Sequence, residues 1–254
     1  MTLSAERIAA MERATLDAVP PAQRDELHGW LVGIDDGVVS RARSAAPLRH
    51  DAGLVQAIEV VMQRYADSGK HALFRVPDTE GLQAVGKHLA RLGAVPESPT
   101  IVQCADSAVV AGAASHLGSG EGLQVTLTDR PDEAWCALFL GDGVGAAEAQ
   151  SRTAVLRRAR DALYARVQVD GETVAVGMGS FSHGWASVHG LRTRTTHRGR
   201  GHAGAIVRRL AQEAAQRGLT AMFLQVEAAN NGAQALYRRL GFCDLWTYRY
   251  WRLA

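Results

Sequence analysis

One segment, residues 191–204, constrains the fold of this chain more than any other. It reads Leu-Arg-Thr-Arg-Thr-Thr-His-Arg-Gly-Arg-Gly-His-Ala-Gly, so arginines and histidines crowd around several glycines. The preceding residues 185–193 are typical of a strand, and residues 201–217 repeat apolar side chains at helical spacing. The segment therefore predicts a strand, a basic glycine-rich turn and the start of a helix.

A helix start of this kind favours an anionic ligand. The first N–H groups of a helix have no partner within the helix, and they carry a partial positive charge that attracts phosphate. Gly199 and Gly201 would let the backbone approach the anion closely, and the arginines add charge. The alternative is a basic surface turn without a ligand. A nucleic-acid patch is not favoured, because no aromatic residues alternate with the arginines.

The segment resembles the pyrophosphate motif of the GNAT superfamily of acyl-CoA-dependent N-acetyltransferases. That motif is Arg or Gln, two residues, Gly, one residue, then Gly or Ala. Members of the superfamily continue with a strand, an Asn, a helix ending Leu-Tyr, and then Gly-Phe. The resemblance covers roughly residues 123–254. The matching residues are Arg198, Gly201 and Ala203 in the first motif, and Leu224, Asn230, Ala233, Leu236, Tyr237, Gly241 and Phe242 in the second.

The resemblance implies acetyl-CoA as the acyl donor, with coenzyme A as product and no metal. It also implies that the strand ending at Thr193 splays from the next strand, so that the pantetheine arm fits between them. Backbone amides near Arg192 and Thr193 would then face the thioester carbonyl. The residues implied to bind the coenzyme are Leu191, Arg192, Thr193, Arg198, Gly199, Arg200, Gly201, His202, Ala203, Gly204 and Asn230.

Three residues are candidates for acid–base catalysis. Tyr237 stands where many members place the acid that protonates the leaving thiolate; the alternative is a packed helix tyrosine. His189 is one candidate for the base, since imidazole titrates near neutrality, and a hydrogen-bonded core histidine is the equal alternative. Glu227 on the neighbouring strand is the second candidate, acting through water, or else as an orienting or structural residue. Period-two alternation places His189 on one strand face with Ser187, Leu191 and Thr193.

The whole chain is expected to be α/β, as two GNAT-like α+β units in tandem. We predict a degenerate N-terminal unit at residues 1–115 and a catalytic unit at 122–254, joined by a small-residue, glycine-rich linker over 111–122. The first half loosely resembles the degenerate half of two-domain GNAT proteins and lacks its own phosphate motif. It is therefore expected to bind no coenzyme and to shape the acceptor pocket.

Periodicity and turn residues predict the elements of both halves. Asp35-Asp36-Gly37 is expected to join two strands as a hairpin, and the glycine-rich stretch 141–145 to be a plain loop. Predicted helices span 4–18, 23–28, 54–65, 82–92, 131–140, 146–159, 201–217 and 232–240, and predicted strands span 30–33, 38–42, 71–76, 100–104, 123–128, 162–169, 173–181, 185–193, 222–226 and 245–251.

Composition narrows the class of protein further. The net charge of +2 is too small to imply nucleic-acid binding by itself. No apolar run reaches the roughly 18 residues of a membrane span, and the N-terminus lacks an apolar signal core, so a cytoplasmic protein without a membrane partner is expected. Cys104, Cys136 and Cys243 lack metal or disulfide spacing and are each expected to be buried. A homodimer is left open.

The expected acceptor is a primary amine of a small molecule. An aminoglycoside-type antibiotic, as in kasugamycin-modifying acetyltransferases, would make the protein a resistance enzyme. Such a cationic sugar requires carboxylates near the site, for which Asp35, Asp36, Asp142 and Glu227 are candidates. A protein or peptide N-acetyltransferase, which needs an open groove, is the alternative enzyme. A non-catalytic acyl-CoA-binding regulator is the alternative outside enzymology.

Overall fold

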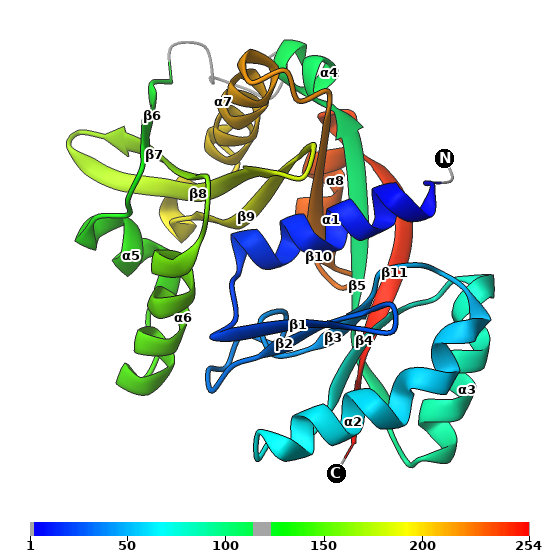
Figure 1. Ribbon diagram of the computed structural model, residues 1–254. Helices are drawn as coiled ribbons and strands as arrows, with labels where there is room; N and C mark the ends of the chain where they lie inside the picture. Colours follow the sequence, from blue (N-terminus) through cyan, green and yellow to red (C-terminus); the bar gives the residue numbers. More distant parts are fainter. Residues whose placement is uncertain (1–2, 114–122, 254) are drawn as a thin grey trace.

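The computed structural model describes residues 3–113 and 123–253, which form a mixed α/β structure as expected (Figure 1). Within these residues the strands build one continuous sheet of eleven. The strands are β1 (Gln23–Leu27), β2 (Trp30–Ile34), β3 (Ala45–Pro47), β4 (Leu73–Pro77), β5 (Val95–Asp106), β6 (Val125–Thr128), β7 (Ala162–Val169), β8 (Glu172–Ser182), β9 (Trp185–Thr193), β10 (Ala221–Glu227) and β11 (Cys243–Arg252). The α-helices are α1 (Ala5–Ala18), α2 (Ile58–Asp67), α3 (Gln83–Arg91), α4 (Ser107–Gly112), α5 (Glu133–Leu140), α6 (Ala146–Arg158), α7 (His202–Gln216) and α8 (Asn231–Arg239).

The strand order is β1-β2-β3-β4-β11-β5-β10-β9-β8-β7-β6. Strand β5 comes from the first half of the chain, yet it lies between β10 and β11 and pairs antiparallel with both. Strand β11 in turn pairs with β4, so the sheet continues across the predicted boundary. The division into units 1–115 and 122–254 stays a prediction. Of the predicted linker, Ala111 and Gly112 end helix α4, and residues 114–122 lie outside the described residues.

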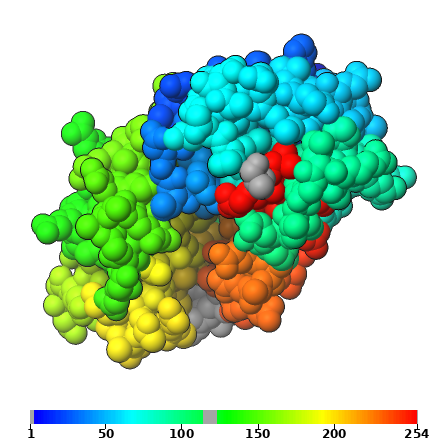
Figure 2. All heavy atoms as spheres, turned by 90° about the horizontal axis from the view of Figure 1, so that it is seen from below, coloured from blue at the N-terminus to red at the C-terminus, as the bar shows by residue number. Residues whose placement is uncertain are grey.

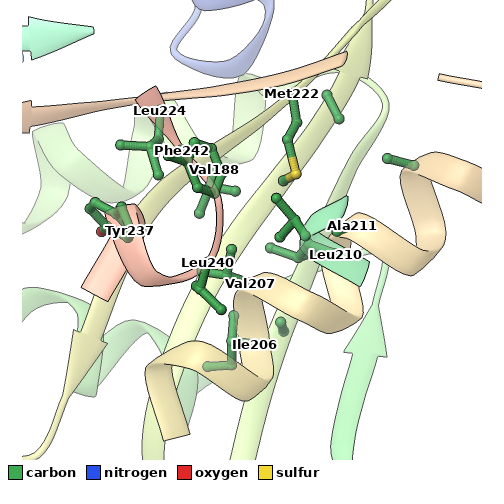
Figure 3. Close-up of a cluster of buried hydrophobic side chains, with 14 of the residues drawn as sticks. Val188, Ile206, Val207, Leu210, Ala211, Met222, Leu224, Tyr237, Leu240 and Phe242 are labelled. Carbon is green, nitrogen blue, oxygen red and sulfur yellow. The ribbon is translucent and has the colours of Figure 1, made fainter. Parts of the chain in front are cut away.

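Helix α7 covers one face of the second half of the sheet. Its apolar stripe, predicted from the sequence, packs against residues of β9 and β10 such as Val188 and Met222 (Figure 3). Tyr237 and Leu240 of α8 join the same cluster. Buried apolar area is the main stabilising term in such a contact, at about 25 cal/mol per Å². This packing holds α7 and α8 on one face of the sheet beside β9 and β10.

The opposite face of these strands is covered by helices from both halves of the chain. Helix α1 begins at Ser4, whose hydroxyl accepts from the N–H of Arg7 as an N-cap, and it packs on β8 and β9. Met11 of α1 shares a core with Trp185. Further along, Trp135 of α5 packs on this face and donates its indole N–H to the carbonyl of Ala165. The N-terminal segment therefore belongs structurally to the second half of the sheet.

A separate core lies under the first half of the sheet. Trp30, Phe74 and Tyr65 are fully buried there, and Trp30 and Phe74 meet edge to face with ring centroids 5.2 Å apart. The Tyr65 hydroxyl donates to the carbonyl of Gly33, so α2 is tied to β2 by a buried hydrogen bond. Helix α3 completes this core through Leu89.

Three local expectations were wrong. Residues 23–28 contain strand β1 instead of a helix; it pairs with β2 through a turn in which His28 and Gly29 both have positive φ. Residues 38–42 form turns, so Asp35–Gly37 does not close a hairpin. Cys243 is exposed, because it begins β11 directly after the turn at Gly241.

Candidate active site

Strands β9 and β10 run parallel and then separate. Their register pairs Met222, Phe223 and Leu224 with Ala186, Ser187 and Val188, and it ends there. Both strands continue, β9 to Thr193 and β10 to Glu227. The inner edges of the two strands beyond Val188 and Leu224 therefore lack a strand partner, which leaves backbone groups available to a ligand.

A β-bulge on β9 follows the point of separation. Val176 of β8 pairs with Arg192 and Met178 pairs with His189, so Gly190 and Leu191 together face one residue of β8. Gly190 has φ of +60°, and a Cβ there would lie 2.8 Å from the ring of Phe139, so only glycine fits. The bulge turns Leu191 toward the core of α7. The expectation that Leu191 shares a face with His189 is wrong for this reason, since strict alternation fails at a bulge.

Helix α7 begins with an open N-terminus. Gly201 is its N-cap at φ of +81° in the left-handed region, and no side chain caps the first turn. The N–H groups of His202, Ala203 and Gly204 therefore face outward without an intrahelical partner. His202 is buried, yet neither of its ring nitrogens has a hydrogen-bond partner among the described residues. Burial lowers the pKa of His202, with the charges of His197 and Arg200 acting in the same direction.

A cleft of about 820 Å³ lies between the end of β9, the start of α7 and helix α8. Every residue predicted to bind coenzyme lines it except Arg200, which is exposed on the turn. Several further lining residues were not predicted to bind the coenzyme, although Ala233 and Leu236 belong to the second motif and His197 and Arg239 are basic. The missed residues are His197, Gly232, Ala233, Leu236 and Arg239.

Tyr237 lines the same cleft from helix α8. The residue is 8% exposed, and its ring packs against Phe242 with centroids 6.0 Å apart. Its hydroxyl has no hydrogen-bond partner among the described residues, and burial raises the pKa of the phenol to about 12. Tyr237 is therefore a protonated donor at neutral pH, with a hydroxyl left for a ligand. Its catalytic role stays a prediction.

His189 lies on the face of the sheet opposite α7. Its Nε2 is 2.8 Å from the Oγ of Ser187, and its Nδ1 is 3.4 Å from Nη1 of Arg41. A guanidinium can only donate, so Nδ1 accepts and Nε2 carries the hydrogen. Burial, and then the charge of Arg41, lower the pKa of His189 to about 3. The ring is neutral and its lone pair is occupied, which is the arrangement of a hydrogen-bonded core histidine.

Glu227 ends β10 and is exposed. It follows Phe223 and Gln225 at alternate positions, so its side chain lies on the face where Phe223 packs with α1. The cleft between β9, α7 and α8 does not include it. The structure thus places Glu227 and His189 on one face of the sheet and Tyr237 on the other, with the separated strands between them.

The chain matches the model of one protein family over residues 5–251, described as "Probable histone acetyltransferase Rv0428c C-terminal". The chain belongs to this family. A comparison with curated proteins found no match.

Several solved structures, two of them of GNAT proteins, have the same fold. A GCN5-related N-acetyltransferase from Kribbella flavida matches with a TM-score of 0.72 at 17% identity, over 99% of this chain and 96% of that one. A tandem GNAT protein from the clavulanic acid biosynthesis pathway matches with a TM-score of 0.60 at 14% identity, over 99% and 97%. A functionally unknown conserved protein from Staphylococcus epidermidis ATCC 12228 matches with a TM-score of 0.64 at 10% identity, over 96% and 98%. The chain therefore has a GNAT fold.

The GNAT cleft of this chain suits a pyrophosphate-bearing coenzyme. The uncapped N-terminus of α7 offers backbone donors, and the unpartnered nitrogens of His202 supply a buried donor or acceptor beside them. Arg198 lines the cleft, and no carboxylate lies within salt-bridge distance of it among the residues that the structure describes. Arg194 is instead paired with Glu172 at 2.9 Å, and Arg192 donates to the carbonyl of Phe139.

The loop between β2 and β3 reaches the other side of the separated strands, where Arg41 contacts His189 and Gln225. The loop between β2 and β3 contacts α6, where the N–H of Val38 donates to the hydroxyl of Ser151 at 2.9 Å. Arg158 of α6 binds Asp35 at 2.5 Å and the carbonyl of Pro20. In Figure 2 the blue segment that includes this loop lies directly against the green surface of α6.

The carboxylates considered for a cationic sugar do not gather at the separated strands. Asp35 pairs with Arg158, and Asp36 pairs with Lys70. Asp142 is exposed on the loop between α5 and α6. Within residues 3–113 and 123–253, no three His, Cys, Asp or Glu side chains are grouped so that they could hold a metal ion. No helix in that part of the chain is long and apolar enough to cross a bilayer.

Proposed function

We propose that this protein transfers the acetyl group of acetyl-CoA to a primary amine of a small molecule. One observation carries the proposal: the cleft between β9 and α8 joins an uncapped helix N-terminus to the unpartnered hydroxyl of Tyr237. The first feature suits a pyrophosphate and the second suits a leaving thiolate, which are the two ends of an acyl-CoA that catalysis must hold. Family membership supports the same chemistry.

Several groups that line the cleft have a role in this proposal. The N–H groups of residues 202–204 and the side chain of Arg198 bind the pyrophosphate. The free edge of β9 beyond Val188 orients the thioester, and its backbone N–H groups stabilise negative charge on the carbonyl oxygen. Tyr237 donates its phenolic proton to the leaving sulfur. The coenzyme supplies the activated acyl group.

Glu227 is a better candidate than His189 for the base that deprotonates the amine. His189 has its only lone pair engaged by Arg41 and a pKa of about 3, so it takes up a proton poorly at neutral pH. Glu227 is exposed on the acceptor face and accepts a proton through a water molecule in our proposal. His189 instead orients Arg41 and Ser187 through its two ring nitrogens.

The β2–β3 loop, which contacts β9 through Arg41 and is tied to α6, favours a small acceptor over a folded protein. An aminoglycoside is less favoured, because Asp35 and Asp36 are already paired with cations. A protein acceptor remains the second candidate on one observation, that the matching family is described as a histone acetyltransferase. A non-catalytic acyl-CoA-binding regulator has no such observation in its favour.

The test is an acceptor panel with acetyl-CoA, followed by free thiol release and by mass spectrometry of the products. The panel holds small primary amines, amino acids, kasugamycin and other aminoglycosides, and a lysine-rich histone-tail peptide. We expect acetylation of a small amine, and at least about a hundredfold less in Tyr237→Phe. If only the peptide were acetylated, the acceptor would be a protein or peptide instead of a small molecule. Thiol release without an acetylated product, unchanged in Tyr237→Phe, would refute transfer by this site.

A further inference from the structure

Arg41 occupies the apex of the separated strands. His189 and Gln225 are the first residues of β9 and β10 after the last register pair, Val188 with Leu224. Nη1 of Arg41 lies 3.4 Å from Nδ1 of His189 and 3.4 Å from Oε1 of Gln225. A side chain from the loop between β2 and β3 therefore bridges the two strands where they begin to diverge, on the face opposite the coenzyme cleft.

Neutral groups hold this arginine in place. Oε1 of Gln225 also accepts from the hydroxyl of Tyr248 at 3.0 Å, and Nε2 of Gln225 donates to Thr15 at 3.2 Å. His189 is neutral as well. Both contacts of Arg41 are long, and neither its Nε nor its Nη2 donates a hydrogen bond within residues 3–113 and 123–253.

Arg41 is half-buried and lacks a counter-ion. Among the described residues, no carboxylate lies within 4.0 Å of its guanidinium or of that of Arg43, whereas Arg24, Arg64 and Arg75 each have one. Withdrawing a cation from water is unfavourable unless an anion or further hydrogen bonds compensate. The planar fork of a guanidinium matches a carboxylate with two parallel hydrogen bonds.

We propose that Arg41 binds a carboxylate of the acceptor, so that the substrate is an amine that also carries a carboxylate, as amino acids do. The inference rests on the proposed function, which brings the thioester to the gap between β9 and β10. An anion on Arg41 lies next to that gap on the acceptor face. A short separation between the carboxylate and the amine then directs the amine nitrogen toward the thioester.

The test compares acceptors that differ only at the carboxylate. Phenylalanine, lysine and β-alanine are each paired with their neutral amide, and kcat/KM is measured with wild type, Arg41→Gln, Arg41→Lys and Arg43→Gln. Arg43 is the control, because it lies on the same turn and near Tyr65 in the first-half core. We expect wild type to prefer the carboxylate form of an accepted pair by about 10- to 100-fold, mainly through KM.

Arg41→Gln should erase that preference by lowering kcat/KM for the carboxylate form far more than for its amide, Arg41→Lys should keep part of it, and Arg43→Gln should keep all of it. Equal use of the two forms by wild type would overturn the inference while leaving the proposed acetyl transfer intact. An equal loss for both forms in Arg41→Gln would also overturn it, since it would indicate action on the thioester. A panel without any acetylated amine would instead refute the proposed function.

A binding measurement separates these failures without relying on turnover. N-Acetylglycine and N-acetylglycinamide are product analogues that differ at the carboxylate alone, and calorimetry measures both against wild type and Arg41→Gln. Tighter binding of N-acetylglycine to wild type, lost in Arg41→Gln, supports the assignment. The same affinity for both compounds, or an affinity unchanged in Arg41→Gln, overturns it.

Discussion

Replacing Tyr237 by Phe removes one oxygen from the coenzyme cleft and little else. The phenol makes no hydrogen bond to the described residues, and its ring packs against Phe242 and the α7 core. We therefore expect the free energy of unfolding to change by less than about 0.5 kcal/mol. Because burial raises the pKa of Tyr237 to about 12, the lost group is a protonated donor at any pH near neutrality.

The effect on catalysis is expected to be large. General acid catalysis contributes about 10²–10⁴-fold, and a hydrogen bond to a charged group is worth about 1.5–3 kcal/mol. A phenol of high pKa gives up its proton reluctantly to a thiolate of lower pKa, so the lower end of the range applies to Tyr237. We expect single-turnover acetyl transfer to fall about a hundredfold in Tyr237→Phe, equivalent to about 2.7 kcal/mol. Coenzyme affinity should stay within about twofold.

The assay is rapid-mixing single turnover beside steady-state kinetics, because slow product release would mask a chemical defect. Tyr164→Phe is the matched control: its buried hydroxyl donates to the carbonyl of Leu156 at 2.6 Å, away from the cleft. That variant should lose about 1 kcal/mol of stability and keep its transfer rate. A wild-type single-turnover rate in Tyr237→Phe, or a loss confined to KM for the amine, would show that Tyr237 is not the acid.

Three further outcomes are expected. Gly201→Asp places a negative charge at the N-terminus of α7 and should abolish acetyl-CoA binding measured by calorimetry. Gly201→Asn is equally suited to positive φ and should retain most of the affinity, so equal acetyl-CoA affinities of the two variants would argue against the phosphate loop. Glu12→Ala leaves Arg75 buried without its partner 2.5 Å away, so the free energy of unfolding measured in urea should fall by about 3–5 kcal/mol. The double variant Glu12→Leu/Arg75→Met should lose less stability, and equal losses in the two variants would contradict this interpretation. Burial lowers the pKa of His50 to about 4 and that of His189 to about 3, so the unfolded state binds more protons than the folded state below pH 6.5. The free energy of unfolding should therefore fall between pH 6.5 and 4, by up to about 1.4 kcal/mol per pH unit for each ring. An unchanged pH slope in the double variant His50→Gln/His189→Gln would refute this.

Long, strongly patterned elements could be predicted from the sequence. The apolar stripe of α7 and the glycine-arginine turn before it predicted where the cleft beside α7 lies, because helix periodicity and helix-terminus chemistry are local properties. Strand β1 was missed because no face of this edge strand is buried, so its residues show no alternation. The prediction of the strand face on which Leu191 lies was wrong, because a β-bulge shifts the alternation of side chains by one residue.

Contacts between distant segments could not be predicted in the same way. Arg41 reaches His189 across a sequence separation of 148 residues, and nothing in the turn around Arg41 indicates which strand it meets. The apparent spare carboxylates, Asp35 and Asp36, are paired with cations that sequence reasoning did not assign to them. Counter-ion pairing is a property of the tertiary structure, and the acceptor that we propose depends on it.

The position of β5 has a consequence for synthesis of the chain. This strand ends at Asp106, but its two sheet neighbours begin only at Ala221 and Cys243. A ribosome adding about 5–20 residues per second makes both neighbours on the order of ten seconds after β5 has emerged. During that interval β5 has two open edges, which can template pairing with another nascent chain. Rapid translation of residues 107–252 would shorten this interval, and a chaperone that shields an unpaired strand would cover it.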